Sequence, residues 1–64
     1  MKKEEKVKVA EHLRVYRAIN RLSQGELGVL CGLTQRTISL IESGEFNRVS
    51  LETLNKAEDY VANH

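Results

Sequence analysis

The chain has 64 residues, a formal net charge of +1 at pH 7, one cysteine and no proline. A single cysteine excludes an internal disulfide, so a chain this short must depend on a small apolar core, with or without a partner chain. Cys31 and the two histidines match no metal-ligand spacing, and no apolar run approaches the ~20 residues that span a bilayer. We therefore expect one soluble, cytoplasmic domain over residues 1–64 with no metal, cofactor or membrane segment.

The charges are unevenly distributed along the chain. Residues 1–22 sum to +4 (seven basic, three acidic), residues 23–44 to −1 (one basic, two acidic) and residues 45–64 to −2 (two basic, four acidic). A low net charge argues weakly against a nucleic-acid binder, but a basic end suits a surface that faces an anionic polymer. Residues 1–6 can form a flexible basic arm, or the charged residues at 2–8 can be a solubilising tail.

Apolar spacing predicts an all-α fold of four helices joined by short connections. The first helix runs from about Glu4 or Val7 to Asn20. Its mainly apolar face has Arg17 beside it and carries four residues at helical spacing: Val9, Leu13, Tyr16 and Asn20.

A capping box starts the second predicted helix. The Ser23 hydroxyl can accept from the backbone N–H of Glu26, while the Glu26 carboxylate can accept from the N–H of Ser23. Leu27 and Leu30 are expected on one face of this helix. Gly32 ends the helix by allowing a left-handed backbone conformation.

Thr34 is the expected N-cap of a third helix that continues to Ser43 and is ended by Gly44. Ile38 and Ile41 point inward from it. The last helix follows a loop at 45–49 and a Ser50 cap, and four of its residues share an apolar face: Leu51, Leu54, Ala57 and Val61.

Residues 23–44 meet the steric requirements of a helix-turn-helix. Gly28 lets the two backbones approach where the helices cross, and Gly32 opens the turn four residues later, while Leu33 belongs to the shared core. The third helix is then held with its outer face exposed, and its first residues can enter a DNA major groove about 12 Å wide.

Four stretches resemble the lambda-repressor-like (Xre/Cro-type) helix-turn-helix family: LSQGEL at 22–27, CGLT at 31–34, TISLIESG at 37–44 and SLETL at 50–54. The resemblance extends over about residues 13–61. It implies a compact four- to five-helix domain, usually dimeric, that binds inverted-repeat operators in phage or bacterial regulators and in antitoxins. Within residues 1–64 we expect no full fifth helix after the fourth.

The resemblance also implies roles for individual residues. Gln35, Arg36 and Ser39 would face base edges; the alternative is an ordinary solvated helix face. Residues implied to contact the DNA backbone are Gln24, Thr34, Thr37, Asn47 and Arg48. Gln24 would also brace the third helix, and either threonine could instead meet a thymine methyl. The chemistry agrees, because Gln pairs with adenine and Arg with guanine for about 1–3 kcal/mol of discrimination each.

Arg17 and Glu42 match the family's buried ion pair between the first and third helices. An Arg on an apolar face needs such a partner, because an unpaired buried charge is costly. The family often has Gly where this chain has Arg21, so Asn20 is expected to adopt the unusual backbone angles there.

A second apolar stripe, formed by Val7, Val15 and Ile19, lies on another face of the first helix. It is either incidental or buries against a second subunit or a partner protein, together with Leu40 or the last helix around Tyr60.

These observations favour a sequence-specific DNA-binding transcriptional regulator. We expect a repressor that acts as a homodimer on double-stranded DNA through the helix at 34–43. The alternative is an antitoxin that neutralises a toxin enzyme through protein contacts. No plausible catalytic set is present, so no enzymatic activity is expected, and Cys31 is expected in the core.

Overall fold

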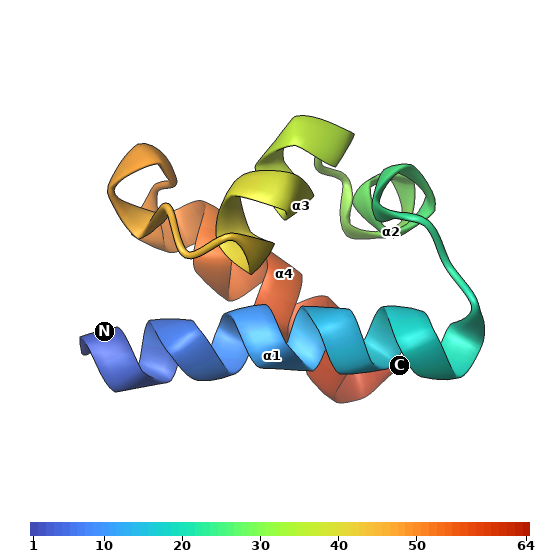
Figure 1. Ribbon diagram of the computed structural model, residues 1–64, viewed down its shortest axis with the longest axis horizontal. Helices are drawn as coiled ribbons and strands as arrows, with labels where there is room; N and C mark the ends of the chain where they lie inside the picture. Colours follow the sequence, from blue (N-terminus) through green and yellow to red (C-terminus); the bar gives the residue numbers. More distant parts are fainter.

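The computed structural model is all-helical and describes the whole chain (Figure 1). The elements are α1 (Lys3–Asn20), α2 (Gln24–Cys31), α3 (Gln35–Glu42), the 3-10 turn η1 (Phe46–Arg48) and α4 (Leu51–Asn63). In Figure 1, α1 runs the length of the molecule along one side, α2 and α3 lie on the other side, and α4 crosses behind α1. The predicted all-α class with four helices is confirmed.

Residues 3–6 belong to α1 and do not form a flexible arm. Only Met1 and Lys2 precede the helix. The Glu5 carboxylate accepts from the backbone N–H of Lys2 at 3.2 Å, and acidic side chains in a first turn complement the positive end of the helix dipole. The Lys and Glu residues of this segment therefore start a helix.

Side-chain caps set the beginnings of the other three helices. The Ser23 hydroxyl accepts from the N–H of Glu26 at 3.0 Å, and the Glu26 carboxylate accepts from the N–H of Ser23 at 2.8 Å. These bonds, above all the one from the Ser23 backbone, hold the pKa of Glu26 below its usual value. Thr34 and Ser50 each accept at 3.1 Å from the backbone N–H three residues later. All three predicted caps are confirmed.

The left-handed residue at the end of α1 is Arg21, with φ 55°, and not Asn20 as predicted. Asn20 remains helical, and its amide donates to the Tyr16 carbonyl at 2.9 Å. Hydrogen bonding along α1 continues to the N–H of Arg21, which reaches the carbonyl of Arg17, so the chain reverses at residue 21.

All four helices contribute to one core. Its buried apolar residues are Val9, Ala10, Leu13, Leu27, Cys31, Ile38, Ile41, Leu54 and Ala57. The apolar faces expected on α2 and α4 are buried only in part, because Leu30 and Leu51 are 45% and 49% exposed. Asn20, at the end of the predicted face of α1, is exposed as well. On α2 the buried stripe is narrow and passes through Leu27, Gly28 and Cys31, so Leu30 lies beside it. Burial raises the pKa of the Cys31 thiol, as expected for a core residue.

Gly28 lies at the closest approach between α2 and the segment that leads into α3. A Cβ there would lie 3.0 Å from the carbonyl carbon of Thr34 and 3.1 Å from the carbonyl oxygen of Leu33. Both neighbours are backbone atoms that cannot rotate away. The turn therefore requires a small residue at position 28, as the sequence predicted for this crossing.

Arg17 and Glu42 join α1 to the last residue of α3. Nε and Nη2 of Arg17 donate to the two Glu42 carboxylate oxygens, each at 2.8 Å. The Glu42 side chain is only 6% exposed and that of Arg17 24%. Burial alone would raise the pKa of Glu42, but hydrogen bonds from Arg17 and Gln24 hold it below its usual value. The pair therefore links two helices through charge-assisted bonds in a largely buried position.

Replacing Arg17 by Ala should lower the free energy of unfolding by about 3 kcal/mol, because it leaves the Glu42 carboxylate buried without its main partner. Arg14→Ala is the matched control. Arg14 lies one turn earlier and donates from the surface to the Glu42 backbone carbonyl, so its loss should cost about 1 kcal/mol or less. Urea denaturation measures both free energies. If Arg17→Ala left the free energy of unfolding and the melting temperature unchanged, the pairing would be contradicted.

Lowering the pH should reduce the contribution of Glu42 to the free energy of unfolding. Because its pKa is lower in the folded chain than the ordinary 4.5, ionised Glu42 stabilises the fold above about pH 4.5. That contribution is lost as the pH falls from 4.5 through the folded-state pKa. Glu42→Gln lacks the titrating group but keeps every other carboxylate, so the stability difference between wild type and variant should shrink between pH 7 and about pH 3. A difference that stays constant over this range would contradict the assignment.

Candidate nucleic-acid interface

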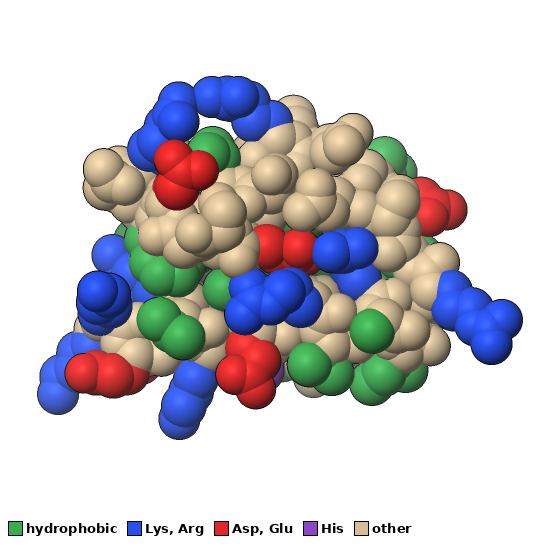
Figure 2. All heavy atoms as spheres, viewed as in Figure 1, with side chains coloured by type: hydrophobic (Ala, Val, Ile, Leu, Met, Phe, Trp, Pro, Cys, Tyr) green, Lys and Arg blue, Asp and Glu red, His purple; other side chains and the backbone are tan.

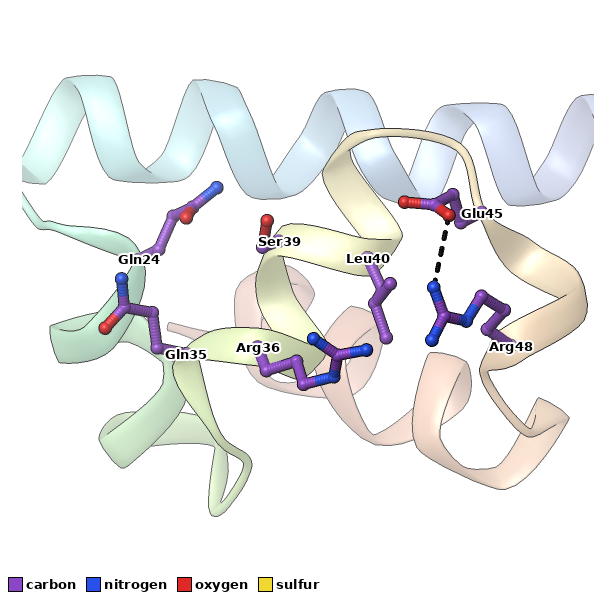
Figure 3. A pocket seen from close by; sticks show the side chains of 7 residues that line it. All are labelled: Gln24, Gln35, Arg36, Ser39, Leu40, Glu45 and Arg48. Carbon is purple, nitrogen blue, oxygen red and sulfur yellow. Dashed lines mark ion pairs between the residues drawn. The ribbon is translucent and has the colours of Figure 1, made fainter.

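An open hollow lies along the outer side of α3, between the start of α2 and the turn that follows α3 (Figure 3). It is lined by seven residues, of which one is apolar: Gln24, Gln35, Arg36, Ser39, Leu40, Glu45 and Arg48. The structure thus brings together five of the eight residues that the sequence indicated for DNA contact.

The exposed face of α3 supplies the centre of the hollow. Gln35 and Arg36 begin the helix, and Ser39 follows one turn later; all three are exposed. Ile38 and Ile41 on the opposite face are fully buried, which fixes the rotation of the helix about its axis. In Figure 3 the Gln35 side chain turns toward Gln24, and the Arg36 side chain extends toward Arg48.

Gln24 braces α3 through its last residue. Its Nε2 donates to the Glu42 carboxylate at 3.1 Å, on the same oxygen that accepts from Nη2 of Arg17. One carboxylate therefore holds residues from both α1 and α2. A primary amide has two N–H groups and a carbonyl oxygen, so Gln24 keeps polar atoms for a further partner at the edge of the hollow.

Three of the residues expected at the DNA backbone lie outside the hollow. The Thr34 hydroxyl caps α3 and lies 2.9 Å from the Thr37 hydroxyl. Thr37 is half-buried, whereas Asn47 is exposed on η1. The structure thus gives Thr34 a capping role, and the Thr37 hydroxyl pairs with the hydroxyl of that cap.

Leu40 and Glu45 also line the hollow, although neither was predicted to contact DNA. Leu40, expected beside the apolar stripe of the first helix, is half-buried four residues after Arg36. That i, i+4 spacing is the sequence signal that places Leu40 on the same face as Arg36. No local pattern indicates that Glu45 lies at the edge of the hollow.

The other predicted stripe does not form one continuous surface. Val15 and Ile19, 49% and 75% exposed, line a hollow between α1 and α4, whereas Val7 lines a separate one near the N-terminus. Figure 2 shows a group of apolar side chains over the C-terminal half of α1 and mostly charged ones along the rest of that helix. Beside the α1–α4 hollow, Nδ1 of His12 lies 2.9 Å from the Glu58 carboxylate.

Chemically, the hollow offers amide, guanidinium and hydroxyl groups, which are the groups that bond base edges and phosphate oxygens. No cluster of three or more His, Cys, Asp or Glu side chains is placed to hold a metal ion. None of the helices combines the length and the apolar character needed to cross a bilayer.

A family model described as a helix-turn-helix domain matches residues 8–61. That stretch includes most of α1, all of α2, α3 and the turn between them, and most of α4. Searches of the curated proteins and of the solved structures gave no significant match. The match spans most of the chain and agrees with the α2–turn–α3 geometry, and the chain therefore belongs to the Xre/lambda-repressor-like helix-turn-helix family of DNA-binding domains.

Proposed function

We propose that this protein is a sequence-specific transcriptional regulator that inserts the first turns of α3 into the DNA major groove. It acts in the cytoplasm by binding, without a catalytic step. The observation that carries this proposal is the exposed set of Gln35, Arg36 and Ser39 on one face of a helix whose other face is buried.

The surroundings of α3 suit a groove with a phosphate backbone on each side. Gln24 and Arg48 lie on opposite sides of the exposed face of α3 (Figure 3). Between them, the Gln35 amide can bond the N6 and N7 edge of adenine, and the Arg36 guanidinium can bond O6 and N7 of guanine. The flanking groups would set the position of the domain on the duplex, and the central groups would read sequence.

We further propose that two copies bind together on an inverted repeat and repress transcription by occupying it. The hollow contains two cationic side chains, Arg36 and Arg48, and one anionic side chain, Glu45. Phosphate neutralisation supplies most sequence-independent affinity, so one copy should bind modestly and with strong salt dependence. Two copies on half-sites about one helical turn apart would raise the affinity through effective concentration.

An antitoxin role is the second candidate, and it has one favourable observation. The hollow formed by α1 and α4 exposes Val15 and Ile19 beside Val61 and contains no residue of α2 or α3. A toxin enzyme bound there would leave the α3 face free. Under this alternative, Val15→Glu would abolish enzyme binding and leave duplex binding intact.

Selection from random duplexes at one stated salt concentration tests base reading. We expect Gln35→Ala and Arg36→Ala each to lose preference at particular positions, by about 1–3 kcal/mol per contacted base. Asn55→Ala is the control, because Asn55 is exposed on α4 outside the hollow. Uniform weakening across all sequences would show that these side chains contact only the backbone.

The spacing of half-sites tests paired binding. With an inverted repeat identified in that selection, insertion of about 5 base pairs turns one half-site to the opposite face of the duplex, about half a helical turn away. We expect two copies to bind the original repeat and the affinity to fall toward that of one half-site after the insertion. One bound copy, with an affinity independent of spacing, would contradict the pairing.

A further inference from the structure

Glu45 is the one acidic residue among the seven that line the hollow, and it lies beside Arg48, which under the proposed function contacts a DNA phosphate. A carboxylate repels phosphate, so its position opposes the binding that the rest of the hollow supports. Figure 3 shows it facing the Arg48 guanidinium beyond the end of α3.

The backbone of Glu45 is fixed by the end of α3. Gly44 adopts φ 82°, a backbone angle that residues other than glycine rarely adopt. Its N–H donates to the carbonyl of Ile41 at 3.1 Å. The N–H of Glu45 donates to the carbonyl of Leu40 at 3.0 Å. These two bonds form a Schellman motif, which places the Glu45 side chain at a set point relative to α3.

Both oxygens of the Glu45 carboxylate have partners within the protein. Oε2 accepts from the Ser43 hydroxyl at 3.1 Å, and Oε1 lies 3.5 Å from Nη1 of Arg48. The backbone N–H of Arg48 also donates to the Glu45 carbonyl at 3.1 Å, because η1 returns the chain by one turn. Backbone and side chain thus hold Arg48 against Glu45.

We propose that Glu45 is an internal competitor of DNA phosphate for Arg48. This inference rests on the proposed DNA-binding function and assigns a regulating residue to the same site. A carboxylate and a phosphate present similar oxygen acceptors to a guanidinium, so each binds Arg48 more weakly while the other is bound. The two side chains are 51% and 49% exposed, and an exposed pair of this kind is weak enough to exchange.

The consequence is a limit on sequence-independent affinity. In the free protein, Glu45 neutralises the charge of Arg48. In the complex, Arg48 turns to the phosphate, and the Glu45 carboxylate is left without its cationic partner close to that phosphate. Base contacts made by Gln35 and Arg36 are not part of this exchange. Glu45 therefore weakens the phosphate contribution to binding and leaves the base-reading groups unchanged.

Glu45→Gln keeps the shape of the side chain and removes its charge. We expect this variant to bind duplex DNA roughly three- to tenfold more tightly at low salt, because one exposed ion pair and one repulsion are removed. The plot of log K against log salt concentration should become steeper by up to about 0.9, the value for one additional phosphate contact. Glu52→Gln is the control for net charge, since Glu52 is exposed on α4 outside the hollow.

The partner is tested by repeating the change in an Arg48→Gln background. If Glu45 acts by holding Arg48, most of the gain from Glu45→Gln disappears there. An equal gain in both backgrounds would overturn the proposal, because it would show general repulsion without competition. Thermal unfolding of each variant verifies that the changes measured are in binding.

The outcomes separate this inference from the function on which it rests. If the wild type binds DNA, Gln35→Ala changes that binding and Glu45→Gln does not, then only the role of Glu45 is overturned. Absence of duplex binding by both wild type and Glu45→Gln at low salt overturns the proposed function and this inference together. Tighter binding that depends on Arg48, with no change for Glu52→Gln, supports both.

Discussion

The Glu42 carboxylate at the last residue of α3 is the point on which the arrangement of three helices depends. Arg17 reaches it from α1 with two bonds of 2.8 Å, and Gln24 reaches it from α2 at 3.1 Å. A domain of this size has few kcal/mol of net stability, so one such network has a large effect on whether the helices keep their angles. Because Gln24 also borders the hollow, the same carboxylate supports the fold and positions the candidate interface.

The division between the two faces of α3 follows from that support. A helix of eight residues is too short to be stable alone in water, so its order comes from packing. Ile38 and Ile41 provide the packing, and the fixed rotation leaves Gln35 and Arg36 outward. The rigidity with which α3 presents the polar groups of the candidate interface is therefore supplied by apolar residues on its buried face.

Electrostatics at the candidate interface are local. Most of the basic residues of the chain lie within residues 1–22, yet none of that segment lines the hollow. The hollow instead combines Arg36 and Arg48 with the opposing Glu45. A chain with a net charge of +1 can thus still present two cationic side chains close together on one surface.

Features with local causes could be predicted from the chain alone: the caps at Ser23, Thr34 and Ser50, the left-handed end of α2 at Gly32 and the outward face of α3. Capping and periodicity depend on residues within a few positions, so they can be read directly from the chain. Tertiary structure decided the rest, because exposure and proximity depend on where helices cross. It left Leu30 and Leu51 about half-exposed, and it brought Glu45 beside Arg48 at the edge of the α3 face.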